Sequence, residues 1–73
     1  MTDIDKAEFY VKNVMTQKDL DDIDTTTEEY KRYYRKRELE IRSIMIFPIS
    51  KKELESRVKT QYHLHKMGFA GFD

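Results

Sequence analysis

The residues in this sequence with the greatest capacity for chemistry are its two histidines, His63 and His65. They belong to a stretch that we expect to be helical, and residues two positions apart on a helix point about 160° away from each other. The two side chains therefore cannot hold one metal ion together. We expect His65 to lie on the apolar side of the helix and His63 to face solvent, and we predict no metal site and no cofactor.

No catalytic constellation accompanies the histidines. The sequence has no cysteine and only two glycines, so it offers neither a cysteine nucleophile nor a glycine-rich phosphate loop. Ser43 and Ser50 have no base-and-acid context nearby, and Ser50 is explained as a helix cap. We therefore expect no enzymatic activity. The absence of cysteine also fits a reducing cytoplasm, which would be that of the host cell for a viral protein.

The acidic segment from Asp19 to Glu29 is a stronger candidate for a functional site than the histidines. It carries six carboxylates in eleven residues. Such a surface presents charge in the manner of nucleic-acid phosphates, so it would suit the basic cleft of a larger protein that handles nucleic acid. The structural interpretation is that these acids are helix caps, first-turn residues and a solvated loop. The candidate residues are Asp19, Asp21, Asp22, Asp24, Glu28 and Glu29.

Two phenylalanines could add apolar contacts to the same interaction. Phe9 projects from the face opposite the apolar stripe of its predicted helix, beside Lys12 and Asn13. Phe72 belongs to an apolar C-terminal tail that either folds back on the core or serves as a docking peptide. The main functional hypothesis is thus a regulator or inhibitor that binds a larger protein through acidic and apolar residues.

The alternative hypothesis is a nucleic-acid-binding module that uses the basic face of the central helix. Its candidate contacts are Arg32, Arg35, Lys36, Arg42, Lys51 and Lys52. Neighbouring tyrosines could stack on bases, but they lie about half a turn from Arg32 and Arg35. Much of the charge is also expected to form i,i+4 ion pairs, namely Glu28–Arg32, Lys36–Glu40 and Glu38–Arg42. Arg35 is the base with the least local compensation.

The formal net charge of zero arises by cancellation between two halves of the chain. Residues 1–29 hold nine acids and three bases, whereas residues 30–73 hold eleven bases and five acids, which gives −6 and +6. Such asymmetry is typical of an acidic or basic interaction surface. We expect the halves to pack and to neutralise one another in part.

Helical periodicity dominates the 73 residues, which is a length for one domain. We predict an all-α bundle of three or four short helices at about 3–15, 17–23, 26–45 and 51–67. Capping boxes are expected at Thr2, Thr16, Thr25 or Thr26, and Ser50, and Gly68 should close the last helix. The core-facing stripes are Ile4, Ala7, Val11, Val14 and Met15, then Tyr30, Tyr33, Tyr34, Ile41, Ile44 and Met45, and then Leu54, Val58, Gln61 and His65.

Two features of the central segment leave alternatives open. Arg37 falls in the middle of the apolar stripe, where it either covers apolar surface with its stem or pairs with an acid of the N-terminal half. Residues 39–47 are rich in β-formers and could instead be a strand that pairs across a homodimer. The composition as a whole, small, charge-dense and free of cysteine, is typical of phage and mobile-element accessory proteins.

Overall fold

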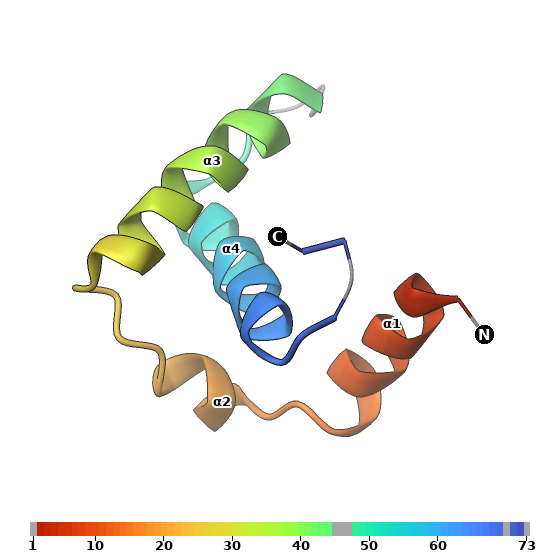
Figure 1. Ribbon diagram of the computed structural model, residues 1–73. Coiled ribbons are helices and arrows are strands. Elements are labelled where there is room, and N and C mark those ends of the chain that lie inside the picture. Colours follow the sequence, from red (N-terminus) through yellow and green to blue (C-terminus); the bar gives the residue numbers. More distant parts are fainter. Residues whose placement is uncertain (1, 45–47, 70, 73) are drawn as a thin grey trace.

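The computed structural model describes residues 2–44, 48–69 and 71–72, in which the chain forms helices and no strand. The helices are α1 (Asp3–Asn13), α2 (Gln17–Asp21), α3 (Glu28–Ile44) and α4 (Lys51–Lys66) (Figure 1). This arrangement confirms the predicted small all-α bundle. Residues 39–44 belong to α3, so the alternative strand is wrong there, and residues 45–47 lie outside the described residues.

The first two helices begin at the predicted capping boxes. Thr2 Oγ1 accepts from the backbone N–H of Asp5, and Asp5 Oδ2 accepts from the backbone N–H of Thr2, both at 3.2 Å. Thr16 and Asp19 repeat the arrangement at the start of α2. Each box satisfies two backbone donors that the first turn of a helix cannot satisfy. These local bonds explain why short and strongly polar segments become helical.

The longest helix, α3, begins one residue later than the predicted caps allow. The backbone N–H of Tyr30 donates to Thr27 Oγ1 at 3.2 Å, so Thr27 is the cap, and Thr25 or Thr26 is not. Thr26 instead donates its backbone N–H to Asp24 at 2.9 Å. The threonine nearest the helix therefore caps it, while its neighbour closes the preceding turn.

Both ends of α4 follow the sequence signals. Ser50 Oγ accepts from the backbone N–H of Glu53 at 3.2 Å, which is one half of the predicted capping box. The Glu53 carboxylate pairs with Arg57 at 3.3 Å instead of completing the box. Gly68 has a φ of 89°, in the left-handed region that glycine enters without a Cβ penalty. The backbone N–H of Phe69 then reaches Leu64 O at 3.1 Å, which completes the Schellman motif that the sequence predicts. The chain is thereby turned back toward α1.

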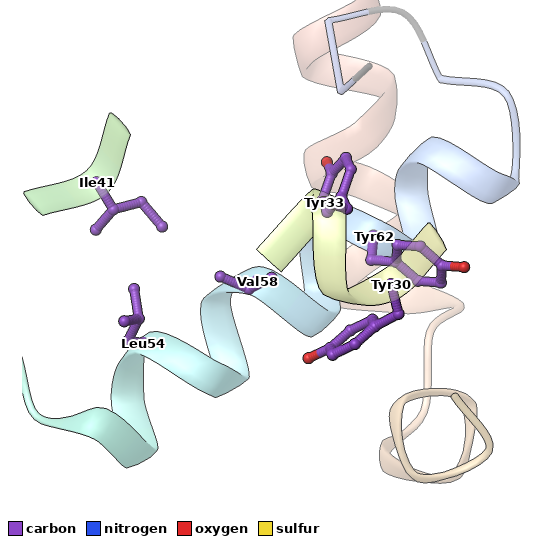
Figure 2. Packing of buried hydrophobic residues seen from close by; sticks show 6 residues of the cluster. All are labelled: Tyr30, Tyr33, Ile41, Leu54, Val58 and Tyr62. Atoms are coloured by element: carbon purple, nitrogen blue, oxygen red, sulfur yellow. The ribbon is translucent and has the colours of Figure 1, made fainter. Parts of the chain in front are cut away.

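The core lies between α3 and α4 and is built around three tyrosines (Figure 2). The Tyr62 ring meets Tyr30 and Tyr33 edge-on, with centroids 5.2 and 5.4 Å apart. Leu54 and Val58 of α4 are also fully buried, and Leu54 faces Ile41 (Figure 2). Each edge-to-face pair stabilises the fold by about 0.5–1.5 kcal/mol beyond the contribution from burying the two rings. The aromatic cluster thus compensates for the low apolar content of the chain.

The predicted apolar stripes are only partly buried. Tyr30, Tyr33 and Ile41 of α3 are buried as expected, but Ile44 is 78% exposed because α4 does not extend alongside the end of α3. In α4 the prediction omitted Tyr62, which is 7% exposed. Met45 lies outside the described residues.

Helix α1 packs mainly on the C-terminal segment and the end of α4, as Figure 1 shows. Ala7 is buried, whereas Ile4 and Val14 of the same predicted stripe are 65% and 54% exposed. The Tyr10 ring lies 5.4 Å from that of Phe69, and its hydroxyl hydrogen-bonds His63 Nε2 at 2.8 Å. The stripe of α1 therefore meets a short segment, which is too narrow to cover it.

A matched pair of leucine substitutions tests the position of the core. Leu54 is fully buried and Leu39 is 71% exposed, and both lie inside helices. We expect Leu54→Ala to lower the free energy of unfolding by about 2–5 kcal/mol. Leu39→Ala should change it by no more than about 0.5 kcal/mol. Urea denaturation followed by circular dichroism measures both, and equal effects would contradict this core.

A second pair of variants tests the tyrosine hydroxyls. The Tyr33 hydroxyl donates to Phe72 O at 2.7 Å, whereas the buried Tyr30 hydroxyl has no hydrogen-bond partner among the described residues. We expect Tyr33→Phe to cost about 1 kcal/mol of unfolding free energy. Tyr30→Phe should cost nothing or stabilise the fold, because it removes a buried donor without an acceptor. A larger loss for Tyr30→Phe than for Tyr33→Phe would refute this assignment.

Candidate functional site

The acidic surface comprises the six carboxylates predicted from the sequence, which lie on α2, on its connection to α3 and on the first turn of α3. Asp19 Oδ2 accepts from the backbone N–H of Thr16 at 2.8 Å. This backbone hydrogen bond is the main cause that lowers the pKa of Asp19, and the Thr16 hydroxyl adds to the effect. Asp19 is therefore both a cap and a firmly ionised carboxylate.

The connection between α2 and α3 holds its charges in a similar way. Asp24 Oδ1 accepts from both the hydroxyl and the backbone N–H of Thr26, and these bonds lower the pKa of Asp24. Asp21 Oδ1 accepts from Gln17 Nε2 at 3.1 Å. The Asp22 side chain is exposed and makes no hydrogen bond or ion pair with another described residue.

Two glutamates complete the acidic surface at the start of α3. Glu28 lies 3.9 Å from Lys31 Nζ, and Glu29 pairs with Lys66 Nζ at 2.6 Å. The Glu29–Lys66 pair joins the start of α3 to the end of α4, and it raises the pKa of Lys66. It is an ion pair between the acidic and basic halves of the chain, in line with the expected partial neutralisation. Both carboxylates nevertheless remain exposed to solvent.

The predicted apolar contacts differ in their accessibility. Phe9 is 57% exposed and borders an apolar groove of about 440 Å³ together with Tyr10, Val14 and Phe69. Phe72 is half-buried and lies with Leu64 against α1, while its carbonyl oxygen accepts from Tyr33. The C-terminal tail thus folds back on the core, and Phe9 supplies the more accessible ring.

Residues of the predicted basic face border three different hollows. Arg32 and Lys36 border a groove beside Tyr33 and His65, whereas Lys52 lies near α2. Arg35 and Lys51 share a third hollow, between α3 and the start of α4. The remaining predicted contact, Arg42, pairs with Glu38 at 3.8 Å, as expected. No single hollow therefore gathers the predicted bases.

Two of the predicted ion pairs have the wrong partner. Glu28 pairs with Lys31 rather than Arg32, and Glu40 pairs with Arg37 rather than Lys36. Positions three apart on a helix are neighbours just as positions four apart are, so spacing alone does not choose between them. Arg37 is 13% exposed at its side chain and lies over the Tyr33 ring, 5.1 Å from the centroid. Its stem covers the core while its head pairs with Glu40.

The two histidines take part in separate aromatic contacts. His65 stacks on Tyr33 with centroids 5.2 Å apart, and His63 stacks on Tyr10 at 5.7 Å. The expectation that His63 faces solvent is wrong, because α1 brings Tyr10 over it and leaves it half-buried. Among the described residues, no group of three or more His, Cys, Asp or Glu side chains could hold a metal ion.

The Tyr10–His63 and Tyr30–Tyr62 contacts were not anticipated from the sequence. Both join residues more than thirty positions apart, so no local periodicity reports them. A weaker signal was present for Tyr62, which follows the stripe residue Val58 by four positions.

The titration of Asp24 tests how the acidic surface is held. The side chain of Thr26 is the largest cause that lowers its pKa, and the backbone N–H of Thr26 is the second. Thr26→Val removes only the side-chain donor, so the pKa of Asp24 should rise toward its ordinary value of 3.8. Carbon-detected NMR titration measures this change, with Asp19 as the unaffected control.

The sign of the linked stability follows from the same bonds. The pKa of Asp24 is lower in the folded state than in the unfolded state. The hydrogen bonds from Thr26 to Asp24 therefore stabilise the fold above about pH 4. The contribution is lost as the pH falls through the folded-state value. Thr26→Val should therefore flatten the acid limb of the stability curve, and an unchanged Asp24 pKa would contradict the assignment.

Within the part of the chain that the structure describes, the helices are too short or too polar to traverse a lipid bilayer. Comparisons with protein families, with curated proteins and with solved structures find no match. Function must therefore be inferred from the charges, exposure and contacts of the chain's own residues.

Proposed function

We propose that the protein is a small, non-enzymatic interaction module that binds a basic region of a larger protein through its acidic surface. The observation that carries this proposal is the fixed placement of two of its carboxylates. Asp19 and Asp24 are held by hydrogen bonds from Thr16 and Thr26, yet they keep their charge. A surface whose charges are already ordered loses less conformational entropy on binding than a flexible acidic loop would.

Exposed apolar residues beside the acidic surface support a protein as the partner. The chain passes from Phe9 and Val14 of the α1 groove into α2 within a few residues. Aromatic side chains are enriched in protein interfaces and often contribute a large share of the binding energy. Charge would steer the encounter with a basic partner, and Phe9 would add an apolar contact at its edge.

Nucleic-acid-handling proteins are the class of partner that this surface fits best. Their clefts are basic because they bind phosphates, and a surface with six carboxylates would occupy such a cleft. The action would then be that of a regulator or inhibitor in the cytoplasm, as in the accessory proteins of phages. The alternative, direct nucleic-acid binding, has less support because no single hollow gathers its candidate bases.

Charge-neutralising variants with a matched control test the proposal. Asp21→Asn combined with Asp22→Asn removes two exposed charges from the acidic surface without touching the core. Asp3→Asn combined with Glu8→Gln removes two exposed charges from α1. In quantitative capture from extracts of the source organism, the first variant should bind its basic partner about tenfold or more weakly, and the second should bind as the wild type does. Equal capture by all three proteins would refute the role of the acidic surface.

A salt series separates the proposal from its alternative. We expect no tight binding of DNA or RNA by the wild-type protein between about 50 and 200 mM salt. Tight binding that weakens steeply over this range, and that is lost on Arg32→Ala, would show instead that the basic residues carry the function.

A further inference from the structure

A second candidate site is a hollow whose border contains none of the six carboxylates of the acidic surface. It lies between α3 and the start of α4 and has a volume of about 330 Å³. Its border is formed by Thr25, Tyr30, Lys31, Tyr34, Arg35, Lys51 and Glu55. Small-molecule sites in proteins typically begin at about 300 Å³. The hollow is therefore large enough for one small ligand and too small for a length of nucleic acid.

The charges around this hollow are only partly compensated within the protein. Arg35 and Lys51 form no ion pair with another described residue, and Lys31 reaches Glu28 only at 3.9 Å. The acid that borders the hollow, Glu55, is engaged by Lys59 Nζ at 3.1 Å. The hollow is thus cationic, and arginine and lysine together are suited to a phosphate group, which arginine can bind through two parallel hydrogen bonds.

Tyr30, which borders the hollow, has a buried hydroxyl that lacks a partner in the described part of the chain. Tyr30 is 5% exposed, and its hydroxyl makes no hydrogen bond with another described residue. Figure 2 shows this hydroxyl pointing away from Tyr33 and Tyr62. Burial raises the pKa of Tyr30 to about 12, so the phenol stays protonated and remains a donor. A buried donor without an acceptor is costly, and an anion in the hollow would provide that acceptor.

An aromatic wall completes the hollow. Tyr34 is half-buried and its ring is tilted against that of Tyr30, with centroids 6.1 Å apart. The flat ring of a ligand can stack on such a wall, and any nucleic-acid base has a suitable ring. Cations, a phenol donor and an aromatic wall together match a ligand that carries a phosphate and a flat ring.

We propose that this hollow binds a single nucleotide, with its phosphate between Arg35 and Lys51 and its base against Tyr34. The remaining candidate bases border other hollows, with Arg32 beside Tyr33 and Lys52 beside α2. This placement favours a mononucleotide over a strand, which would need a continuous cationic track. The site is independent of the acidic surface, so either proposal can fail while the other stands.

Isothermal titration calorimetry and NMR chemical-shift mapping test this site on the full chain. Both use adenosine 5′-monophosphate as the ligand, the first to measure its Kd and the second to locate its site. At about 0.15 M salt we expect a Kd below about 1 mM, with shifts centred on Tyr34 and the start of α4. Arg35→Ala and Lys51→Ala should each weaken binding about tenfold. The matched controls Arg32→Ala and Lys52→Ala remove equally exposed charges outside the hollow and should leave the Kd unchanged.

Further ligands and one conservative variant separate the parts of the site. Adenosine should bind at least tenfold more weakly than the nucleotide, and so should inorganic phosphate, because each lacks one half of the recognised chemistry. Tyr30→Phe, which keeps the core, should weaken nucleotide binding while leaving the fold at least as stable as the wild type.

Four outcomes would overturn the proposal. They are an absence of nucleotide binding at millimolar concentration, equal binding of phosphate and nucleotide, equal losses for Arg32→Ala and Arg35→Ala, and an oligonucleotide bound far more tightly than the mononucleotide. The third would indicate general electrostatic attraction, and the fourth would indicate a strand-binding surface. Neutralising Asp21 and Asp22 should leave nucleotide binding intact, which distinguishes this site from the acidic surface.

Discussion

The edge-on contact of Tyr62 with Tyr30 and Tyr33 is the interaction on which the rest of the structure depends. A chain with 38% charged residues and no cysteine has few ways to join two helices. Tyrosine supplies apolar area, but its hydroxyl must find a partner when it is buried. For Tyr33 that partner is the carbonyl oxygen of Phe72, so the core itself ties down the C-terminal segment. The segment then provides the surface on which α1 packs.

This dependence sets an order of stability across the molecule. The pair α3 and α4 holds the fully buried residues Leu54 and Val58, whereas α1 contributes only Ala7 to the buried set. Its attachment relies on Tyr10, through His63 and Phe69. Elements with few buried apolar contacts open first. The groove beside Phe9 thus lies on the least anchored helix, which can open without loss of the core.

The helices could be predicted because their caps depend on residues close together in the sequence. Contacts between residues far apart in the sequence could not be predicted in this way. Thr2, Thr16 and Ser50 start helices where the sequence indicates, because a cap needs only residues three positions apart. The choice of Thr27 over its neighbours was missed, since three consecutive threonines offer equivalent oxygens. The burial of His63 was missed for a different reason. It depends on Tyr10 of α1, which is 53 positions away in the sequence. The acidic surface was predictable as a set of residues, but its holding bonds were not.

The antiparallel packing of α3 and α4 determines where charge is neutralised and where it is not. Helix dipoles favour acids at the first turn and bases at the last, so Glu29 of α3 and Lys66 of α4 meet at one end as partners. Along the flank, the same packing brings Arg35 and Lys51 to one hollow. Folding thus resolves part of the charge asymmetry of the sequence and concentrates the remainder. A net charge of zero is therefore compatible with an acidic surface and a separate cationic hollow.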